Sequence, residues 1–323
     1  MFCYAFAKKI LLIEGQGEIL LDFFDIEKLP DYPHNGWNDQ LEYFNTQYTR
    51  VNNISYSKFS KVKKKFFPPK ELNFFQKILY LYHRCFFEFF VHKYNNKSRD
   101  ELPNVLKSYS TYLATRGLYI FPRSVATAPI KNKYTNYFLY SQFENAEYYK
   151  GEQSLLYNEF VPDIIPRNDE MYNEILNSES VCITIRRGDF LSTENINSFF
   201  QCGTKYFDES IRIIKEKINN PTFFFFSDDI IFAEEYANSI LDSKDKYYIE
   251  NEGNSIYEKI RLMTTCKHFV ISNSTFSWWC QYLGRHSEKL VVGPKHWHFH
   301  SLDKRYDLLV QDTWLKINNE FME

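Results

Sequence analysis

Two adjacent arginines follow an apolar run in the stretch VCITIRRGDF, residues 181–190. The guanidinium groups of Arg186 and Arg187 suit phosphate oxygens, through charge-assisted hydrogen bonds worth about 1.5–3 kcal/mol each. Successive strand residues point to opposite faces of a sheet, so only one arginine is expected to reach an anion unless the strand has ended. The other would be held by Asp189 or lie against another element. A purely structural Arg–Asp pair is the alternative for the whole motif.

Two aspartates, Asp228 and Asp229, follow a second apolar run, TFFFFS at 222–227. Carboxylates in this place could bind a metal, a ribose hydroxyl, or the N1–H and exocyclic amine of guanine, for which a carboxylate is the matching bidentate acceptor. The structural alternative is that at least one of them caps a helix beginning near residue 230.

A third apolar run, HFVIS at 268–272, leads into Asn273, Ser274 and Thr275. Ser274 and Thr275 open a helical pattern, and the free N–H groups and positive dipole end of a helix form an anion site. Plain capping explains these two residues equally well. Their significance lies in sharing a sheet edge with the arginines.

The elements that position these groups alternate between short apolar runs and amphipathic helices, which is typical of a parallel α/β sheet. Strands are expected at 181–186, 222–227, 246–250, 268–272 and 289–294, and helices at 204–218, 255–266 and 274–283, with Gly284 ending the last as its C′ residue. Ligands of open α/β sheets bind beyond the carboxyl ends of the strands. All three polar groups are predicted there.

Residues 1–150 show irregular periodicity, and few elements can be placed in them. We expect an opening helix, a long helix at 71–94, and short strands near 117–121 and 136–140. The 71–94 segment is aromatic and amphipathic, and the interpretation favoured is a helix packed in the core, with a membrane-surface helix as the alternative.

A domain boundary is expected between Phe160 and Ser178, where VPDIIPRND supplies two prolines and several polar residues. The prediction is an acceptor-side domain at 1–165 and a nucleotide-binding domain at 166–323.

Composition excludes several classes of protein. A formal charge of -2 and a pI near 6.5 argue against nucleic-acid binding, and the basic run KVKKKFF at 61–67 is too short to change that.

Six cysteines without a C-x-x-C pair indicate reduced, buried thiols of a cytosolic protein. No metal is expected at HWHFH, 296–300, which lacks companion ligands. No apolar run is long enough to form an integral membrane span.

The combination of RRGD at 186–189, SDD at 227–229 and SNSTFSWW at 272–279 resembles the glycosyltransferase family 11 α-1,2-fucosyltransferases. The likeness extends through FLYSQFENAEYY at 138–149 to MFCYAFAKKI at 1–10. It implies a GT-B fold, with two Rossmann-like domains facing across a cleft, and metal-independent, inverting transfer of L-fucose from GDP-β-L-fucose.

The expected acceptor is O2 of a terminal galactose in an oligosaccharide or surface polysaccharide, including lipid-linked glycans. Bacterial relatives of this kind would act in the cytoplasm or at the inner membrane surface.

The resemblance also implies roles for single residues. Arg187 or Arg186 would hold the β-phosphate, and Asp189 would orient the arginine. Glu194 has a counterpart proposed as the general base in core α-1,6-fucosyltransferases. The nucleotide would be lined by Asp228 and Asp229 near the guanine and ribose, and by Asn273, Ser274, Thr275 and Phe276.

The chain departs from the family pattern in two places. Thr184 stands where the family often has His in H-x-R-R-x-D. Relatives also place a β-strand and a G-G-L-G-N-Q segment directly before M-F-x-Y-A-F-A-K, and this sequence begins at that methionine. The expectation is therefore that the first strand and the glycine-rich turn of the N-terminal domain are missing, through a misplaced start or a truncation, so that GDP-fucose binds poorly. The alternatives are a catalytically silent GDP-sugar-binding module and a transferase of another nucleotide sugar.

Overall fold

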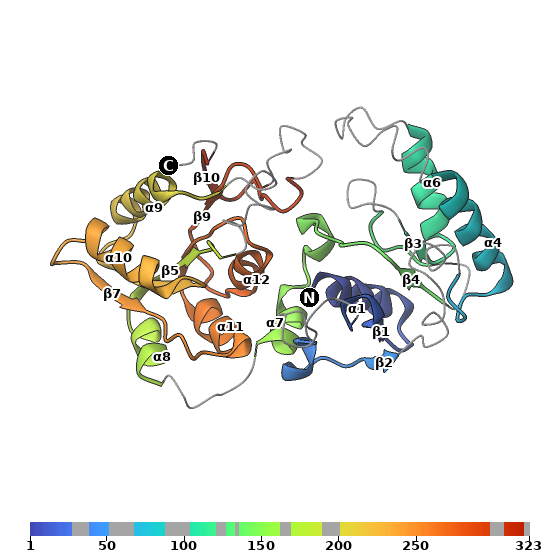
Figure 1. Cartoon of the computed structure of the whole chain (residues 1–323), viewed down its shortest axis with the longest axis horizontal. Coiled ribbons are helices and arrows are strands. Elements are labelled where there is room, and N and C mark those ends of the chain that lie inside the picture. The colour runs from blue at the N-terminus through green and yellow to red at the C-terminus, as the bar shows by residue number, and fades with distance from the viewer. Residues whose placement is uncertain are drawn as a thin grey trace. The chain divides into compact units, whose positions relative to one another are not determined.

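The computed structural model describes residues 1–27, 39–51, 68–87, 104–120, 127–132, 136–161, 169–188, 201–297 and 307–319 (Figure 1). They form two compact units. Unit 1 comprises Met1–Glu42 and Thr46–Lys150, and unit 2 comprises Tyr43–Asn45 and Gly151–Glu323.

The division falls before the predicted boundary at residue 165, because helix α7 (Gln153–Phe160) packs within unit 2. The ring of Phe160 lies 5.4 Å from that of Trp279. The short segment Tyr43–Asn45 joins the same unit through the Asn45 N–H, which donates to the carbonyl of Glu159 at 3.0 Å.

Unit 2 is built on a six-stranded, fully parallel sheet in the order β10-β9-β8-β5-β6-β7. The strands are β5 (Glu179–Ile185), β6 (Pro221–Ser227), β7 (Lys246–Ile249), β8 (His268–Val270), β9 (Val291–Pro294) and β10 (Leu315–Ile317). The five predicted strands are confirmed. The sixth, β10, was not predicted, because three residues do not establish a periodic pattern.

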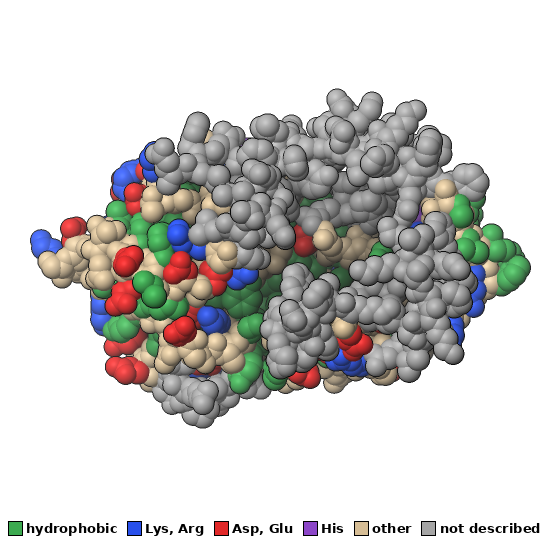
Figure 2. Space-filling model, in the orientation of Figure 1, with side chains coloured by type: hydrophobic (Ala, Val, Ile, Leu, Met, Phe, Trp, Pro, Cys, Tyr) green, Lys and Arg blue, Asp and Glu red, His purple; other side chains and the backbone are tan. Residues whose placement is uncertain are grey.

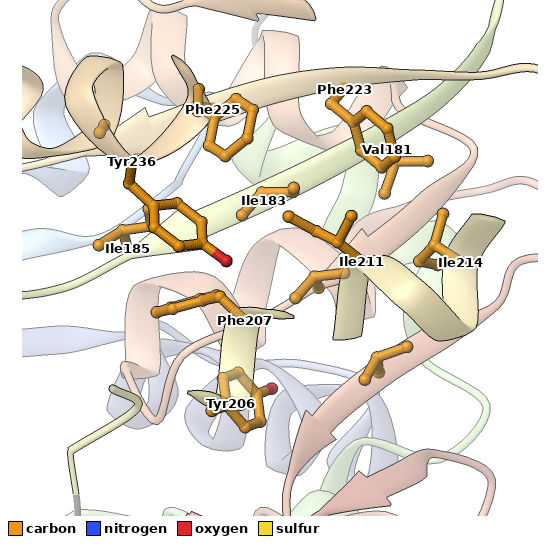
Figure 3. Close-up of a cluster of buried hydrophobic side chains, with 14 residues drawn as sticks. Val181, Ile183, Ile185, Tyr206, Phe207, Ile211, Ile214, Phe223, Phe225 and Tyr236 are labelled. Carbon is orange, nitrogen blue, oxygen red and sulfur yellow. The ribbon is translucent and has the colours of Figure 1, made fainter. Parts of the chain in front are cut away.

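Helices cover both faces of this sheet. They are α8 (Asp169–Leu176), α9 (Thr204–Lys217), α10 (Ile230–Ile240), α11 (Ile256–Thr265) and α12 (Thr275–Leu283). Figure 3 shows Val181, Ile183 and Ile185 of β5 in one cluster with Ile211 and Ile214 of α9. Because both faces of β5 and β6 are buried, these strands have continuous apolar sequences rather than alternating ones.

Cysteines line the other face of the sheet. Cys182 of β5 lies beside Cys266, which follows α11, and Cys280 of α12, and all three are buried. All six cysteines are free thiols, but Cys3 and Cys85 are exposed, so the prediction that the thiols are buried was wrong for these two. Each lies next to a buried residue in a helical turn, and the Cys3 thiol donates to the Ser141 carbonyl at 3.3 Å.

Unit 1 contains two separate parallel strand pairs within its described residues. The pairs are β1 (Leu20–Asp22) with β2 (Thr49–Val51), and β3 (Leu118–Tyr119) with β4 (Phe138–Leu139). The helical elements are α1 (Phe2–Glu14), α2 (Phe24–Glu27), η1 (Leu41–Tyr43, whose last residue belongs to unit 2), α4 (Phe74–Tyr82), the π-helical turn η3 (His83–Phe87), α6 (Asn104–Ala114) and η6 (Ala146–Tyr149). The Rossmann-like character of this unit and the GT-B arrangement stay predictions.

Helix α4 begins with a complete capping box, in which Asn73 and Gln76 each accept the other's backbone N–H. The buried Gln76 amide also donates to the carbonyls of Arg116 and Asn136, at 2.7 and 2.9 Å. Gly117 lies between them with φ of 77°, and a Cβ there would meet the Asn136 carbonyl oxygen at 2.3 Å. The capping box and the Gln76 amide together fix which side of α4 faces the unit.

The predicted 71–94 helix begins at Phe74 rather than at residue 71, with an α-helical part to Tyr82 and a π-helical turn to Phe87; residues 88–94 lie outside the described residues. One side of α4 packs in a core cluster through Tyr80, as expected, but the exposed side carries large apolar side chains. None of the helices that the structure describes is both long and apolar enough to cross a bilayer.

Candidate functional site

The strand order of unit 2 reverses between β5 and β8, which makes their carboxyl ends the topological switch point where doubly wound sheets bind ligands. Strand β5 ends at Ile185, so Arg186 and Arg187 lie beyond it. Strand alternation therefore does not separate the two arginines. The residues after β6 and β8 reach the same edge.

Asp228 holds the turn that follows β5. Its Oδ1 accepts the Arg187 N–H at 2.9 Å, and its Oδ2 accepts the Gly188 N–H at 2.9 Å and lies 3.1 Å from Arg186 Nη1. A Cβ on Gly188 would lie 2.6 Å from Oδ2, so any larger residue would displace the carboxylate from these contacts. The register of β5 on β6, which pairs Ile185 with Ser227, places the carboxylate beside that turn.

Arg187 is tethered at its inner nitrogen and stacked on a ring. Its Nε donates to Asp229 Oδ2 at 3.2 Å, and its Cζ lies 3.7 Å from the centroid of the Phe232 ring. Among the described residues, its two terminal amino groups have no hydrogen-bond acceptor, and the side chain is 33% exposed. The guanidinium is therefore held in place by its Nε and its flat face, and the donors of its terminal amino groups could bind an anion.

Asp229 also caps α10, because its Oδ1 accepts the Phe232 N–H at 3.0 Å. The capping alternative is confirmed for this residue. The arginine partners seen in the structure are thus Asp228 and Asp229. Contact of these two aspartates with guanine or ribose stays a prediction.

Ser227, which belongs to the SDD motif but had no predicted role, connects the ends of three strands. Its hydroxyl donates to the Ile185 carbonyl and accepts the Asp229 N–H, both at 2.9 Å, and its own N–H donates to Glu250 Oε1 at 3.0 Å. Glu250, just after β7, pairs with Lys259 at 2.8 Å. Burial raises the pKa of the Glu250 carboxyl. A carboxylate directly after an apolar strand, the same signal that marked Asp228, would have identified Glu250.

Thr184 ties β5 to the segment that leads into α12. Its Oγ1 accepts the Ser272 N–H at 3.0 Å, and Ser272 Oγ lies 3.4 Å from Ser277 Oγ. All three side chains are buried. At the position where the family often has His, the hydroxyl of this chain therefore makes a local bond between strands.

The N-terminus of α12 is open. Ser274 occupies the N-cap position, but its side chain makes no capping hydrogen bond, so simple capping does not account for this residue. The first intrahelical bond runs from the Trp278 N–H to the Ser274 carbonyl at 2.9 Å. The N–H groups of Thr275 and Phe276 precede that bond, which leaves them for another acceptor.

Asn273 has a different role from its neighbours. It is buried, and its Nδ2 donates to the Trp297 carbonyl at 2.9 Å. This bond holds the segment after β9 against the end of β8. The Asn273 Oδ1 accepts the Cys202 thiol at 3.8 Å, and the contact of Asn273 with nucleotide stays a prediction.

The C-terminus of α12 is firmly held. Lys289 Nζ donates to the carbonyls of Gln281 and Gly284, at 2.5 and 2.9 Å, and Gln153 Nε2 donates to those of Tyr282 and Gly284, at 2.6 and 2.8 Å. Burial lowers the pKa of Lys289 to about 8. Gly284 ends the helix as predicted, but with φ of -55° rather than a left-handed conformation. Glycine is needed there because a Cβ would lie 2.5 Å from the Phe269 ring.

Two predicted catalytic residues, Asp189 and Glu194, lie outside the described residues, as do His298 and His300 of HWHFH and the basic run at 61–67. Within the described ranges, no group of three His, Cys, Asp or Glu side chains could hold a metal ion. The structure places Arg186, Arg187, Asp228 and Asp229 in contact with one another. Asn273, Ser274, Thr275 and Phe276 follow the neighbouring strand β8 at the same edge of the sheet.

Residues 96–317 match the family described as glycosyl transferase family 11. The chain belongs to glycosyl transferase family 11. The family match includes every described residue of the site at the switch point.

Two curated relatives come from Escherichia coli. An alpha-1,2-colitosyltransferase is 34% identical over 158 residues, which cover 48% of this chain and 54% of the relative. The O-antigen biosynthesis glycosyltransferase WbnK is 27% identical over 198 residues, covering 58% of this chain and 62% of the relative. The chain thus spans between half and two thirds of the length of these relatives. No solved structure matches it.

Proposed function

We propose that this family 11 protein transfers L-fucose, with inversion, from GDP-β-L-fucose to a hydroxyl of a glycan acceptor, O2 of a terminal galactose. The observation that supports this most is the pairing of a fixed arginine with an open helix N-terminus at the switch point of a doubly wound sheet. Both features favour a diphosphate as the ligand, and membership of the family favours a sugar nucleotide as the molecule that carries it.

The barrier of such a transfer depends on the charge that grows on the departing GDP. Fixed donors aimed at the β-phosphate stabilise that charge without reorganising during the reaction. Arg187 is held by Asp229 and Phe232, and the N–H groups that open α12 are fixed by the helix itself. These groups would supply the stabilisation.

The carboxylates of Asp228 and Asp229 reduce the net charge of the site, but they also prevent the guanidinium groups from moving. The proposal is that no metal is needed, because the arginines and the helix N-terminus take the part that a divalent cation plays in other nucleotide-sugar sites. Turnover that survives EDTA would agree with it.

Deprotonation of the acceptor hydroxyl is assigned to Glu194, on the resemblance alone. A general base must come within hydrogen-bond reach of the proton that it removes. Replacing Glu194 with Gln is therefore expected to lower kcat while the affinity for GDP is unchanged.

Colitose is the second candidate for the transferred sugar, because one relative is named an alpha-1,2-colitosyltransferase. Colitose is the 3-deoxy counterpart of fucose, so the two donors present the same diphosphate to the arginines. Acceptors of O-antigen type are favoured by the name of the other relative.

The test measures GDP release and glycan product with GDP-fucose and GDP-colitose, over a set of galactose-terminated acceptors. Arg187→Ala should lower kcat by roughly 10²–10³-fold, as removal of one preorganised donor does. Arg212→Ala is the matched control, since Arg212 lies on the exposed side of α9 and pairs only with acids of its own helix. Binding of GDP-sugar without turnover of any acceptor would instead identify a silent binding module.

A further inference from the structure

The outer side of α4 exposes large apolar side chains. Phe74 is 72% exposed and Phe75 64%, and Ile78, Leu81 and Tyr82 are exposed as well. At 3.6 residues per turn these five side chains cover an arc of roughly 120°. Figure 2 shows hydrophobic surface at the right-hand edge of the view, where Figure 1 places α4.

The opposite side of the same helix is already packed. Gln76, Tyr80 and His83 are buried, and Tyr80 belongs to a cluster with Leu113 of α6 and Leu118 of β3. The capping box and the two hydrogen bonds of the Gln76 amide fix this orientation. The exposed face is therefore not a core face that has been turned outward.

The charges around this face are mostly positive. In residues 68–85 and 108–116, whose side chains the structure describes, one acid, Glu71, accompanies the cations Lys70, Lys77, Arg84 and Arg116. Arg84 is buried, whereas Lys70 is exposed and Lys77 and Arg116 are partly so. The whole chain has a formal charge of -2, so this surface differs in sign from the average.

Lys77 lies on α4 itself, beside the exposed Phe74 and Ile78. Its Nζ donates to the carbonyl of Lys70 at 3.0 Å, so the two lysines lie together at the start of the helix. The Arg116 guanidinium stacks 3.5 Å from the centroid of the Tyr112 ring, which is itself exposed. Cationic and aromatic groups therefore occur together on this part of unit 1.

We propose that the outer face of α4 docks on an anionic lipid surface, with Phe74, Phe75 and Ile78 in the boundary between headgroups and acyl chains. Aromatic and aliphatic side chains bordered by lysine are the composition of interfacial helices, and each cation near an anionic leaflet adds to the attraction. A second copy of this chain is a poorer occupant, because a symmetric contact would bring the two sets of cations together. This inference does not depend on which sugar the protein transfers.

The experiment measures co-sedimentation of the full chain with vesicles of phosphatidylcholine alone, or of phosphatidylcholine mixed with phosphatidylglycerol. The parent chain should bind the mixed vesicles, and less so as salt is raised. The double variant Phe74→Ser/Phe75→Ser should bind them at least about tenfold more weakly, because partial burial of two phenylalanines is lost.

Ile231→Ser is the matched control, since Ile231 of α10 is 73% exposed and lies in the other unit. It should leave vesicle binding unchanged. The replaced phenylalanines are mostly exposed, so circular dichroism and thermal unfolding of the double variant should match the parent. A second variant, Lys70→Gln/Lys77→Gln, should weaken binding to the mixed vesicles and flatten its salt dependence.

Three results would overturn the proposal. One is equal vesicle binding by the parent and the Phe74→Ser/Phe75→Ser variant. Another is binding to phosphatidylcholine alone that is as tight as binding to the anionic mixture. The third is a parent dimer that does not bind vesicles and that the same double variant converts to a monomer, which would assign the face to a second copy.

Discussion

At the scale of single residues, short contacts between side chains and backbone N–H groups hold the candidate site together. Asp228 receives two backbone N–H groups and a guanidinium because Gly188 has no side chain in the way. Thr184 satisfies a backbone N–H of the neighbouring strand segment. Each of these two contacts can be tested by a substitution that changes only one or two atoms.

Gly188→Ala should disrupt the turn after β5, because its Cβ would lie 2.6 Å from Asp228 Oδ2. We expect at least about tenfold weaker GDP binding by isothermal titration calorimetry, since the turn positions both arginines. Gly253→Ala is the control, as its Cβ would meet nothing closer than 3.6 Å. Equal GDP affinity of the Gly188→Ala variant and the parent would show that the turn does not position a ligand.

Thr184→Val keeps the shape of the side chain but leaves the Ser272 N–H without its buried acceptor. The free energy of unfolding should fall by about 1–3 kcal/mol in urea titrations, the cost of an unsatisfied buried donor. Thr184→Ser retains the hydroxyl and should lose less than Thr184→Val. The reverse ranking would mean that the methyl group, and not the hydrogen bond, matters at this position.

At the scale of elements, α12 is closed at one end and open at the other. Lys289 and Gln153 occupy the carbonyls of its last turn, while Ser274 leaves the first N–H groups for a ligand. A cation at the C-terminus and an anion at the N-terminus both complement the helix dipole. The protein thus supplies the first of these charges, and the donor substrate would supply the second.

Lys289→Met should remove the hydrogen bonds to the carbonyls of Gln281 and Gly284 while filling much of the same space. A loss of about 1–3 kcal/mol of stability is expected, because buried carbonyls lose their donor. Lys295→Met, at an exposed lysine after β9, should change stability by less than about 0.5 kcal/mol. Chemical denaturation followed by tryptophan fluorescence would report both variants, since Trp278 and Trp279 lie in α12.

The elements of unit 2 were largely predictable, because long apolar runs such as TFFFFS identify strands that are buried on both faces. The positions of the polar groups followed from the same reasoning. The partners of those groups were not predictable, because they depend on the register of β5 against β6 and on a glycine that permits a close approach. Strand β10 and the three-residue strands β1 and β2 of unit 1 are too short to produce a periodic signal, whereas β3 and β4 lie within the strands predicted near 117–121 and 136–140.

At the scale of the whole molecule, stability in acid should fall in part through His83 of unit 1, a histidine outside the predicted site residues. Burial, followed by the charge of Arg84, lowers the pKa of His83 from 6.5 to about 3. The unfolded chain therefore binds a proton before the folded chain does. The contribution of neutral His83 to stability is complete above about pH 6.5 and is lost as the pH falls toward 3.

The corresponding test compares urea unfolding of the parent and of His83→Asn at pH 7 and pH 4. The parent should lose more free energy of unfolding over this interval than the variant, by up to about 3 kcal/mol. Carboxylates that titrate in the same range affect both proteins equally, so the difference isolates the imidazole. Parallel losses in the two proteins would show that His83 does not titrate in this way.

The pairing of β5 with β8 also affects how the chain folds during synthesis. Val181 of β5 pairs with His268 of β8, which is synthesised 87 residues later. One edge of β5 therefore has no partner strand until β8 has been made. Until then the nascent sheet ends in an unpaired edge, next to the four consecutive phenylalanines of β6. Apolar, uncharged strands in this state associate readily with other chains. We therefore expect the yield of native protein on refolding to fall as the protein concentration rises, and to recover when a holdase chaperone is present.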